Sequence, residues 1–527
     1  MKKTFCIIFS FILILCLGAC RELPTTLSAP TENENKIIKE NDPGVFNLLY
    51  CYGDSFNPYF SKTTSNRQVA LLLFDSLVKC DNSFSAVFAL AQSAEVTENV
   101  CTVTLRDAVF SDGTPVTADD VVYSYNLAKE SPRYMHNFYE VVSVTMINSK
   151  TISFELTQHD PYFANLLDFP ILKSGSSDVA DADGKELPPI GCGRYVLAED
   201  NLSLKQNENY YGAKGIITRV NLINSPDAAS TSHYVEVGAC DAYYTESDNI
   251  VRMSGKKIDV NLNHLIYIGV NTNYGSLATK EMRYALSSAI ERSAICRTAY
   301  YNKALSATGF FHPDFKPTLA VQTIENIPNH KITVENLSKI GYNNMNSNGF
   351  YSNSSGNNPV FSLIVNSENV ARVTAAKLIA QQCKAAGIQI NVVECSYEQY
   401  LDRLTKGDFH LYLGEVKLSN NMDFTQLVTP GGSAAYGIGP VKTPEESDAP
   451  STDIVPDTAT KSNCELILES YHTGTCSISD VAATLLTEMP QIPICYLSGA
   501  MFYTSDIKGG VFASESDIYL NIENYEF

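Results

Sequence analysis

The chain lacks the short motifs that carry hydrolytic, metal-dependent or phosphate chemistry. Its 527 residues contain no GxSxG nucleophile elbow, no HExxH zinc pair and no GxxxxGKS or GxxxxGKT phosphate loop. The eight histidines are scattered, and no CxxC pair is present. We therefore expect no catalytic residues, no metal site and no cofactor, and we predict that the protein is not an enzyme.

Basic residues are scarce and tryptophan is absent. Lys and Arg total 38 against 58 Asp and Glu, which gives a formal net charge of -20. Such a surface repels phosphate backbones, so nucleic acid is not an expected partner. The aromatic content rests on 24 Phe and 30 Tyr, and the polar tip of a tyrosine suits a wet pocket.

Long apolar runs are also missing, apart from one at the start of the chain. Lys2 and Lys3 precede an apolar run over residues 5–17, and small residues then lead to Cys20. The run is shorter than the roughly 20 residues that span a bilayer, and its flanks are typical of an export signal. A cysteine directly after small residues is what lipoprotein processing needs, because its thiol takes the diacylglyceryl group. We predict a signal peptide over residues 1–19 and lipidation of Cys20.

The polar stretch over residues 20–43 then predicts a flexible linker between the lipid and a globular body. The protein would thus be anchored at the extracytoplasmic face of the cell membrane, in a periplasm or at the cell surface.

The cysteines do not predict a disulfide framework. Of the 14, Cys6 and Cys16 lie in the signal and Cys20 is the lipid site, which leaves 11. An odd number cannot all pair within one chain. Cys101 lies in the strand-like run VCTV, where cysteine behaves as a small hydrophobe. We expect buried free thiols.

A turn and a capped helix start lie within residues 110–130. Ser111, Asp112 and Gly113 have turn chemistry, and Thr117 with Asp120 three residues later predicts a capping box. These capping roles account for the polar residues, so the segment is interpreted as structural.

Other segments alternate strand and helix patterns. Residues 45–52 are strand-like and are followed by a turn-rich loop. Over residues 265–292 a strand leads through a turn into a helix with a buried stripe, and Arg283 and Arg292 are expected on its flanks. Residues 367–386 predict a helix that ends at Gly387 and leads into another strand. This alternation is typical of an α/β lobe.

Taken with residues 188–196 and 209–212, these segments resemble the family 5 extracellular solute-binding proteins of ABC importers, which include oligopeptide- and dipeptide-binding proteins. The resemblance runs from about residue 45 to residue 527. It implies an α/β fold of the two-lobed periplasmic-binding-protein type II, with a hinge between the lobes and an extra domain in the first. Lobe I would comprise residues 44–78, 181–263 and 481–527, its extra domain residues 79–180, and lobe II residues 264–480. Two polar stretches, 343–358 and 430–463, are expected to be surface loops.

The resemblance also implies a function. Members capture a ligand by lobe closure and deliver it to an ABC permease and its ATPase, and a peptide is the expected ligand. A non-peptide ligand (nickel, haem or an oligosaccharide) and a surface receptor or adhesin without transport remain alternatives. We expect a monomer.

Candidate ligand-binding residues follow from the same resemblance. Peptide-binding members hold the ligand as an added β-strand, and the corresponding main chain here is Tyr52, Gly53 and Asp54 from lobe I and Val416 to Asn420 from lobe II. Tyr267 aligns with a cleft-side aromatic residue.

One position departs from the family pattern. Peptide-binding relatives carry a tryptophan and then an aspartate that pairs with the ligand's α-ammonium. When Asp423 is aligned with the acidic residue that follows, Asn420 occupies the place of the aspartate. A neutral amide holds an ammonium less well than a carboxylate does. Asp423 or Glu415 could substitute after a small shift of register, and a structural role for both is equally open.

Overall fold

The computed structural model describes residues 42–177, 179–180, 184, 186–246, 253–439 and 461–527. The described residues form one compact unit. The predicted signal peptide and Cys20 lie outside the described residues, as does most of the predicted linker. Within the described part of the chain, no helix combines the length and the apolar character needed to cross a membrane.

The first lobe has a four-stranded sheet in the order β1-β10-β9-β8. β1 (Val45–Tyr50) pairs in parallel with β10 (Arg219–Asn224), and β9 (Ser203–Gln206) and β8 (Tyr195–Leu197) follow antiparallel. Helix α2 (Thr64–Leu73) packs against β1, and α4 (Ala228–Glu236) leads to β11 (Ala242–Thr245).

A second sheet of the first lobe lies within residues 91–156. Its strands run in the order β4 (Ala91–Thr97), β5 (Val100–Leu105), β7 (Thr151–Leu156) and β6 (Val141–Asn148), all antiparallel. Helix α3 (Ala118–Ala128) starts at the predicted capping box, where the Thr117 N–H donates to Asp120 Oδ2 at 2.8 Å. A short hairpin, β2 (Val78–Cys80) with β3 (Ala86–Phe88), precedes this sheet.

A larger sheet forms the second lobe and extends into the first, in the order β11-β19-β12-β18-β16-β17 with β13 also paired to β19, and its strand β11 packs in the first core. These strands are β11 (Ala242–Thr245), β12 (Lys256–Val270), β13 (Ala304–Ser306), β16 (Val360–Asn366), β17 (Gln389–Cys395), β18 (Leu411–Lys417) and β19 (Ile492–Tyr503).

Helices α5 to α12 all belong to the second lobe. They are α5 (Lys280–Ser288), α6 (Arg292–Thr298), α7 (His330–Lys339), α8 (Val370–Ala385), α9 (Tyr397–Lys406), α10 (Thr425–Val428), α11 (Asn463–His472) and α12 (Ile478–Glu488). Helix α8 lies in the predicted helical segment and is followed by Gly387, whose φ is +81°. The polar stretch 343–358 carries a small hairpin, β14 (Asn344–Met345) with β15 (Tyr351–Ser352), and residues 440–460 of the other polar stretch lie outside the described residues.

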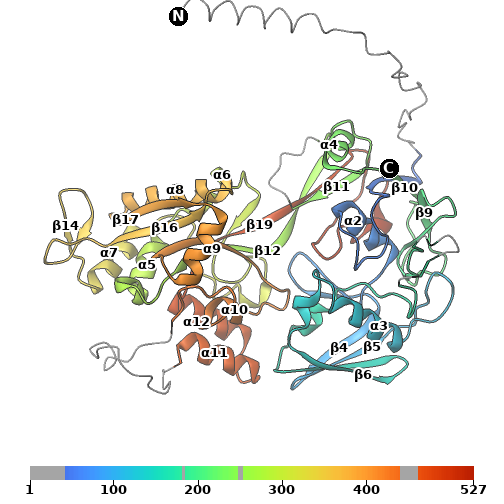
Figure 1. Ribbon diagram of the computed structural model, residues 1–527, viewed down its shortest axis with the longest axis horizontal. Coiled ribbons are helices and arrows are strands. Elements are labelled where there is room, and N and C mark those ends of the chain that lie inside the picture. Colours follow the sequence, from blue (N-terminus) through green and yellow to red (C-terminus); the bar gives the residue numbers. More distant parts are fainter. Residues whose placement is uncertain (1–41, 178, 181–183, 185, 247–252, 440–460) are drawn as a thin grey trace, which may run out of the picture. The chain divides into compact units, whose positions relative to one another are not determined.

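Two long strands connect the lobes. In β12, Val260 packs in the first core and Leu265 in the second, and in β19 Tyr496 packs in the second core and Met501 in the first. β12 and β19 lie side by side (Figure 1) and pair antiparallel. Their register is irregular between Asn261 and Leu265. The last lobe I segment was expected to start at residue 481. Because α12 and the first part of β19 pack in the second core, the chain returns to the first core later than that, within β19.

The prediction that Arg283 and Arg292 lie on the flanks of the helix within residues 265–292 is wrong. Arg283 is 6% exposed and Arg292 is fully buried. The helix ends at Ser288, and a new one starts at Arg292, whose guanidinium donates to Ser287 O and to Pro493 O. These bonds to backbone carbonyls satisfy a buried cation, which periodicity alone does not reveal.

The described cysteines form no disulfide framework. No disulfide joins any two of these 11 cysteines, and ten of them are buried. This agrees with the expectation from the sequence.

Candidate ligand-binding site

The loop after β1 carries the first group of predicted ligand-binding residues. Gly53 is exposed, and the Tyr52 hydroxyl donates to Leu222 O at 3.2 Å. The Asp54 carboxylate accepts the Thr63 N–H and hydroxyl, both at 2.7 Å, and the Lys62 N–H at 2.9 Å. Burial alone would raise the pKa of Asp54, but these hydrogen bonds hold it below its usual value. The carboxylate therefore closes its own loop, while the backbone of Gly53 is accessible.

The segment after β18 carries the second group. Val416 pairs with Leu265 in β12 and is partly buried. The Asn420 carbonyl accepts Asn165 Nδ2 at 2.9 Å, and the neighbouring Asn421 donates to Asp160 Oδ2 at 2.8 Å. This loop of the second lobe thus meets the part of the first lobe that precedes residue 170. Among the described residues, no hydrogen bond or ion pair joins it to the loop Tyr52, Gly53 and Asp54.

Asp423 is held by its own surroundings. Its carboxylate accepts the Thr425 N–H at 2.9 Å and lies 3.6 Å from His472 Nε2. Burial would raise the pKa of Asp423, yet His472 and Thr425 lower it, and Asp423 in turn raises the pKa of His472 against the effect of burial. The pair fixes the start of α10 against the end of α11.

Tyr267 lies inside the second lobe. Its side chain is 2% exposed, its hydroxyl lies 3.2 Å from that of Tyr412, and burial raises its pKa to about 12. Gly414 stands opposite in β18, where a Cβ atom would come within 2.8 Å of the Tyr267 ring. In this structure the ring packs in the core.

Glu415 has two basic neighbours. It forms an ion pair with Arg372, and its Oε1 lies 3.6 Å from His264 Nδ1. Burial would raise the pKa of Glu415, but both neighbours lower it. Its negative charge is thus compensated by groups of its own lobe.

Charged residues that the sequence did not single out gather beside a small hollow of the first lobe. Its lining includes Arg67, Arg133 and Asp168, and its volume of about 20 Å³ fits one water molecule. Burial raises the pKa of Asp168 to about 6, although the charge of Arg133 opposes the shift. No motif marks these residues, because their proximity arises only from the fold.

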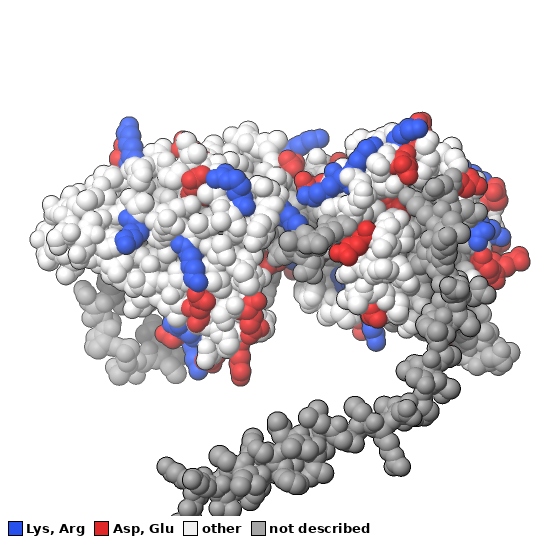
Figure 2. All heavy atoms as spheres, turned by 90° about the horizontal axis from the view of Figure 1, so that it is seen from above, with Lys and Arg blue, Asp and Glu red and all other residues white. Residues whose placement is uncertain are grey.

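The second lobe and the C-terminal segment add charges near Asp168. Lys417, at the end of β18, pairs with Glu515, and the charges of both act on the titration of Asp168. Carboxylates and cations from both lobes thus lie near one another. Figure 2 shows acidic and basic side chains interspersed on the face that it draws.

Buried ion pairs involve three other residues that line the small hollow, Asp75, Lys79 and Asp517. Asp517 lies 2.8 Å from Lys79 Nζ and 2.9 Å from Arg194 Nη2, and Lys79 also lies 2.9 Å from Asp75. The two cations lower the pKa of Asp517 to about 2 although burial would raise it. This network joins the C-terminal segment to the first lobe and is therefore interpreted as structural.

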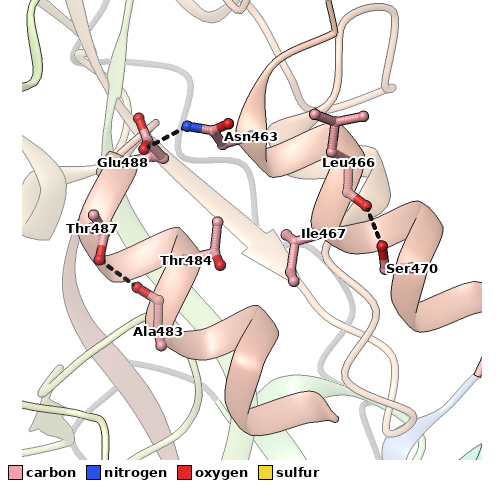
Figure 3. A pocket seen from close by; sticks show the side chains of 8 residues that line it. All are labelled: Asn463, Leu466, Ile467, Ser470, Ala483, Thr484, Thr487 and Glu488. Carbon is pink, nitrogen blue, oxygen red and sulfur yellow. Dashed lines mark hydrogen bonds between the residues drawn. The ribbon is translucent and has the colours of Figure 1, made fainter. Parts of the chain in front are cut away.

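A larger hollow of about 440 Å³ lies between α11 and α12. Figure 3 shows its lining, in which Asn463 donates to Glu488 at 2.9 Å and Ser470 donates to Leu466 O at 2.9 Å. It contains none of the predicted ligand-binding residues.

Two α/β lobes joined by two long strands define a solute-binding protein of the two-lobed type. The family model for "Bacterial extracellular solute-binding proteins, family 5 Middle" matches residues 86–437. The chain therefore belongs to this family, which confirms the resemblance and the fold class inferred from the sequence.

Known relatives agree with this assignment. The chain is 24% identical over 436 residues to the oligopeptide-binding protein AppA of Bacillus subtilis, covering 75% of this chain and 77% of that protein. Two solved structures share the fold. The unliganded open form of the murein tripeptide-binding protein MppA has a TM-score of 0.71 at 19% identity, covering 91% of this chain and 97% of that one. A nickel ABC transporter protein from Bacillus halodurans has a TM-score of 0.70 at 18% identity, covering 92% and 99%.

Proposed function

We propose that this protein captures a peptide between its two lobes and delivers it to an ABC importer. The observation that carries the proposal is the passage of β12 and β19 from one core to the other, because two strands form a hinge about which lobes can close. Membership of family 5 and the likeness to AppA support a peptide as the ligand.

The charges near Asp168 suit a zwitterionic ligand. A carboxylate with a raised pKa gains from an ammonium partner, and Arg133 offers a guanidinium for a carboxylate. We assign Asp168 and Arg133 as partners of peptide termini, together with backbone groups of Tyr52, Gly53, Asp54 and the segment from Val416 to Asn420. Asp423 and Tyr267 are assigned indirect roles, since both are engaged within the second lobe.

Asn420 provides the test of this proposal. Asn420→Asp restores the carboxylate that relatives place at the aligned position, so we expect tighter binding of peptides with a free amine and no gain for N-acetylated peptides. Asn348→Asp, in an exposed loop of the second lobe, adds the same charge and is the matched control. Affinities would be measured by calorimetry with peptides of different lengths.

The same calorimetric measurements, made with non-peptide ligands, distinguish the alternatives. If only a nickel complex, haem or an oligosaccharide binds, the family assignment stands and the proposal of a peptide ligand is overturned. If the protein binds a ligand but has no cognate permease, a receptor or adhesin becomes the favoured function.

The lipid anchor belongs to the same proposal. We assign the lipid to Cys20, which would hold the protein at the extracytoplasmic face of the membrane as a monomer. Mass spectrometry of the purified full chain and of Cys20→Ser tests the modification, and light scattering tests the monomer.

A further inference from the structure

Three residues from distant parts of the chain meet near the hinge. Glu246 follows β11, His264 lies in β12, and Glu515 lies in the segment after β19. One ligand atom from each residue lies within 4.8 Å of the others. Within the described ranges, no second group of three such side chains has this spacing.

The histidine has a free nitrogen that is already oriented. His264 Nε2 is fully buried and has no hydrogen-bond partner among the described residues. Its other nitrogen, Nδ1, lies 3.6 Å from Glu415 Oε1, and Glu415 is held by Arg372. Metal-binding histidines commonly direct their second ring nitrogen at a carboxylate, which fixes the tautomer and leaves a lone pair for the metal.

Each glutamate is already engaged by one polar neighbour. Glu515 Oε1 pairs with Lys417, and Glu246 Oε1 accepts the Tyr244 hydroxyl at 3.2 Å. A carboxylate has lone pairs on two oxygens, so either residue can bind a cation without losing its neighbour. Lys417 lies opposite His264 in the β12–β18 pair and would weaken binding of a cation.

One imidazole nitrogen and two carboxylate oxygens are ligands for first-row divalent transition metals. An all-oxygen site would instead favour calcium or magnesium. We propose that Glu246, His264 and Glu515 bind one such ion, with Glu415 orienting the imidazole and water filling the remaining position. None of the three ligands, nor Glu415, is among the residues proposed to contact the peptide, although Glu515 pairs with Lys417 of the segment from Val416 to Asn420.

The test uses the mature chain after chelator treatment. Titration with Co²⁺ or Zn²⁺ should show one ion bound per chain, and the Co²⁺ form should show visible d–d absorption without a thiolate charge-transfer band. The missing band distinguishes this site from binding by the free cysteines.

Variants locate the ion. We expect His264→Gln and Glu246→Gln each to lower Zn²⁺ affinity at least about tenfold, as ligand or ligand-support changes commonly do. Lys417→Met should raise it. His233→Gln changes an exposed histidine in α4 and should leave the affinity unchanged.

Two results would overturn the site: no stoichiometric ion in the wild-type chain, or equal affinity in His264→Gln and His233→Gln, which would mean an adventitious ion only. Peptide binding is measured on the same samples. If His264→Gln loses the metal and still binds peptide, this inference is separated from the proposed function. If His264→Gln does not fold, Glu246→Gln, at an exposed position, provides the same test.

Discussion

Gly269 faces a tyrosine ring so closely that a methyl group would clash with it. A Cβ atom built there would lie 1.8 Å from the ring of Tyr412, which lies opposite Gly269 in β18 and is itself buried. We expect Gly269→Ala to lower the unfolding free energy by about 1–3 kcal/mol, as overpacking of a core does. Urea denaturation measures the change. Gly53→Ala, where the nearest atom would be 3.9 Å away, is the control, and an equal loss in both variants would contradict the packing argument.

The pair of Asp423 and His472 predicts a pH window of stability. The folded pKa of His472 is raised above 6.5, so its contribution is present below pH 6.5 and is lost as pH rises through the folded pKa. The folded pKa of Asp423 is lowered below 3.8, so its contribution is present above pH 3.8 and is lost on further acidification. The destabilisation caused by His472→Gln should therefore be larger at pH 5 than at pH 8. Urea titrations at both pH values measure it, and a loss that does not change with pH would exclude the charge interaction.

At the scale of elements, Arg292 joins α5, α6 and β19. Its guanidinium donates to Pro493 O at 2.9 Å, Ser287 O at 3.1 Å and Ser287 Oγ at 2.8 Å, and burial lowers its pKa to about 10. Lysine cannot make these bonds in the same planar arrangement. We expect Arg292→Lys to cost about 1–3 kcal/mol, because buried acceptors lose their donors. Thermal and urea unfolding measure the loss, and Arg297→Lys, on the exposed side of the same helix, should stay within about 0.5 kcal/mol.

Local signals in the sequence predicted individual helix starts and ends well, but not the contacts between elements that are distant in the chain. The capping box of Thr117 and Asp120 and the glycine after α8 are short-range features, so the sequence revealed them. The break between α5 and α6 depends on a buried cation bonded to β19, more than 190 residues away. Arg133, Asp168 and Glu515 likewise come together only through the fold, so no pattern indicated them.

At the scale of the whole molecule, the sequence likewise did not reveal the residue contacts at the hinge. Family resemblance predicted two lobes, and the family and fold are confirmed. The contacts of individual residues at the crossing, such as Gly499 against Tyr244, came from the structure alone.

Gly499 lies in β19 where the strand passes between the cores. It pairs with Val260 in β12, and a Cβ atom there would lie 2.9 Å from the Tyr244 hydroxyl in the first core. Gly499→Ala should therefore push the Tyr244 ring and restrict the rotation of one lobe against the other. We expect a smaller ligand-induced decrease in the radius of gyration and weaker peptide binding, measured by small-angle scattering and calorimetry. Adding Tyr244→Ala removes the obstructing ring, so the double variant should close more fully than Gly499→Ala alone. Equal closure of the wild type and Gly499→Ala would show that this crossing does not limit the movement, and the hinge would then lie elsewhere along β12 and β19.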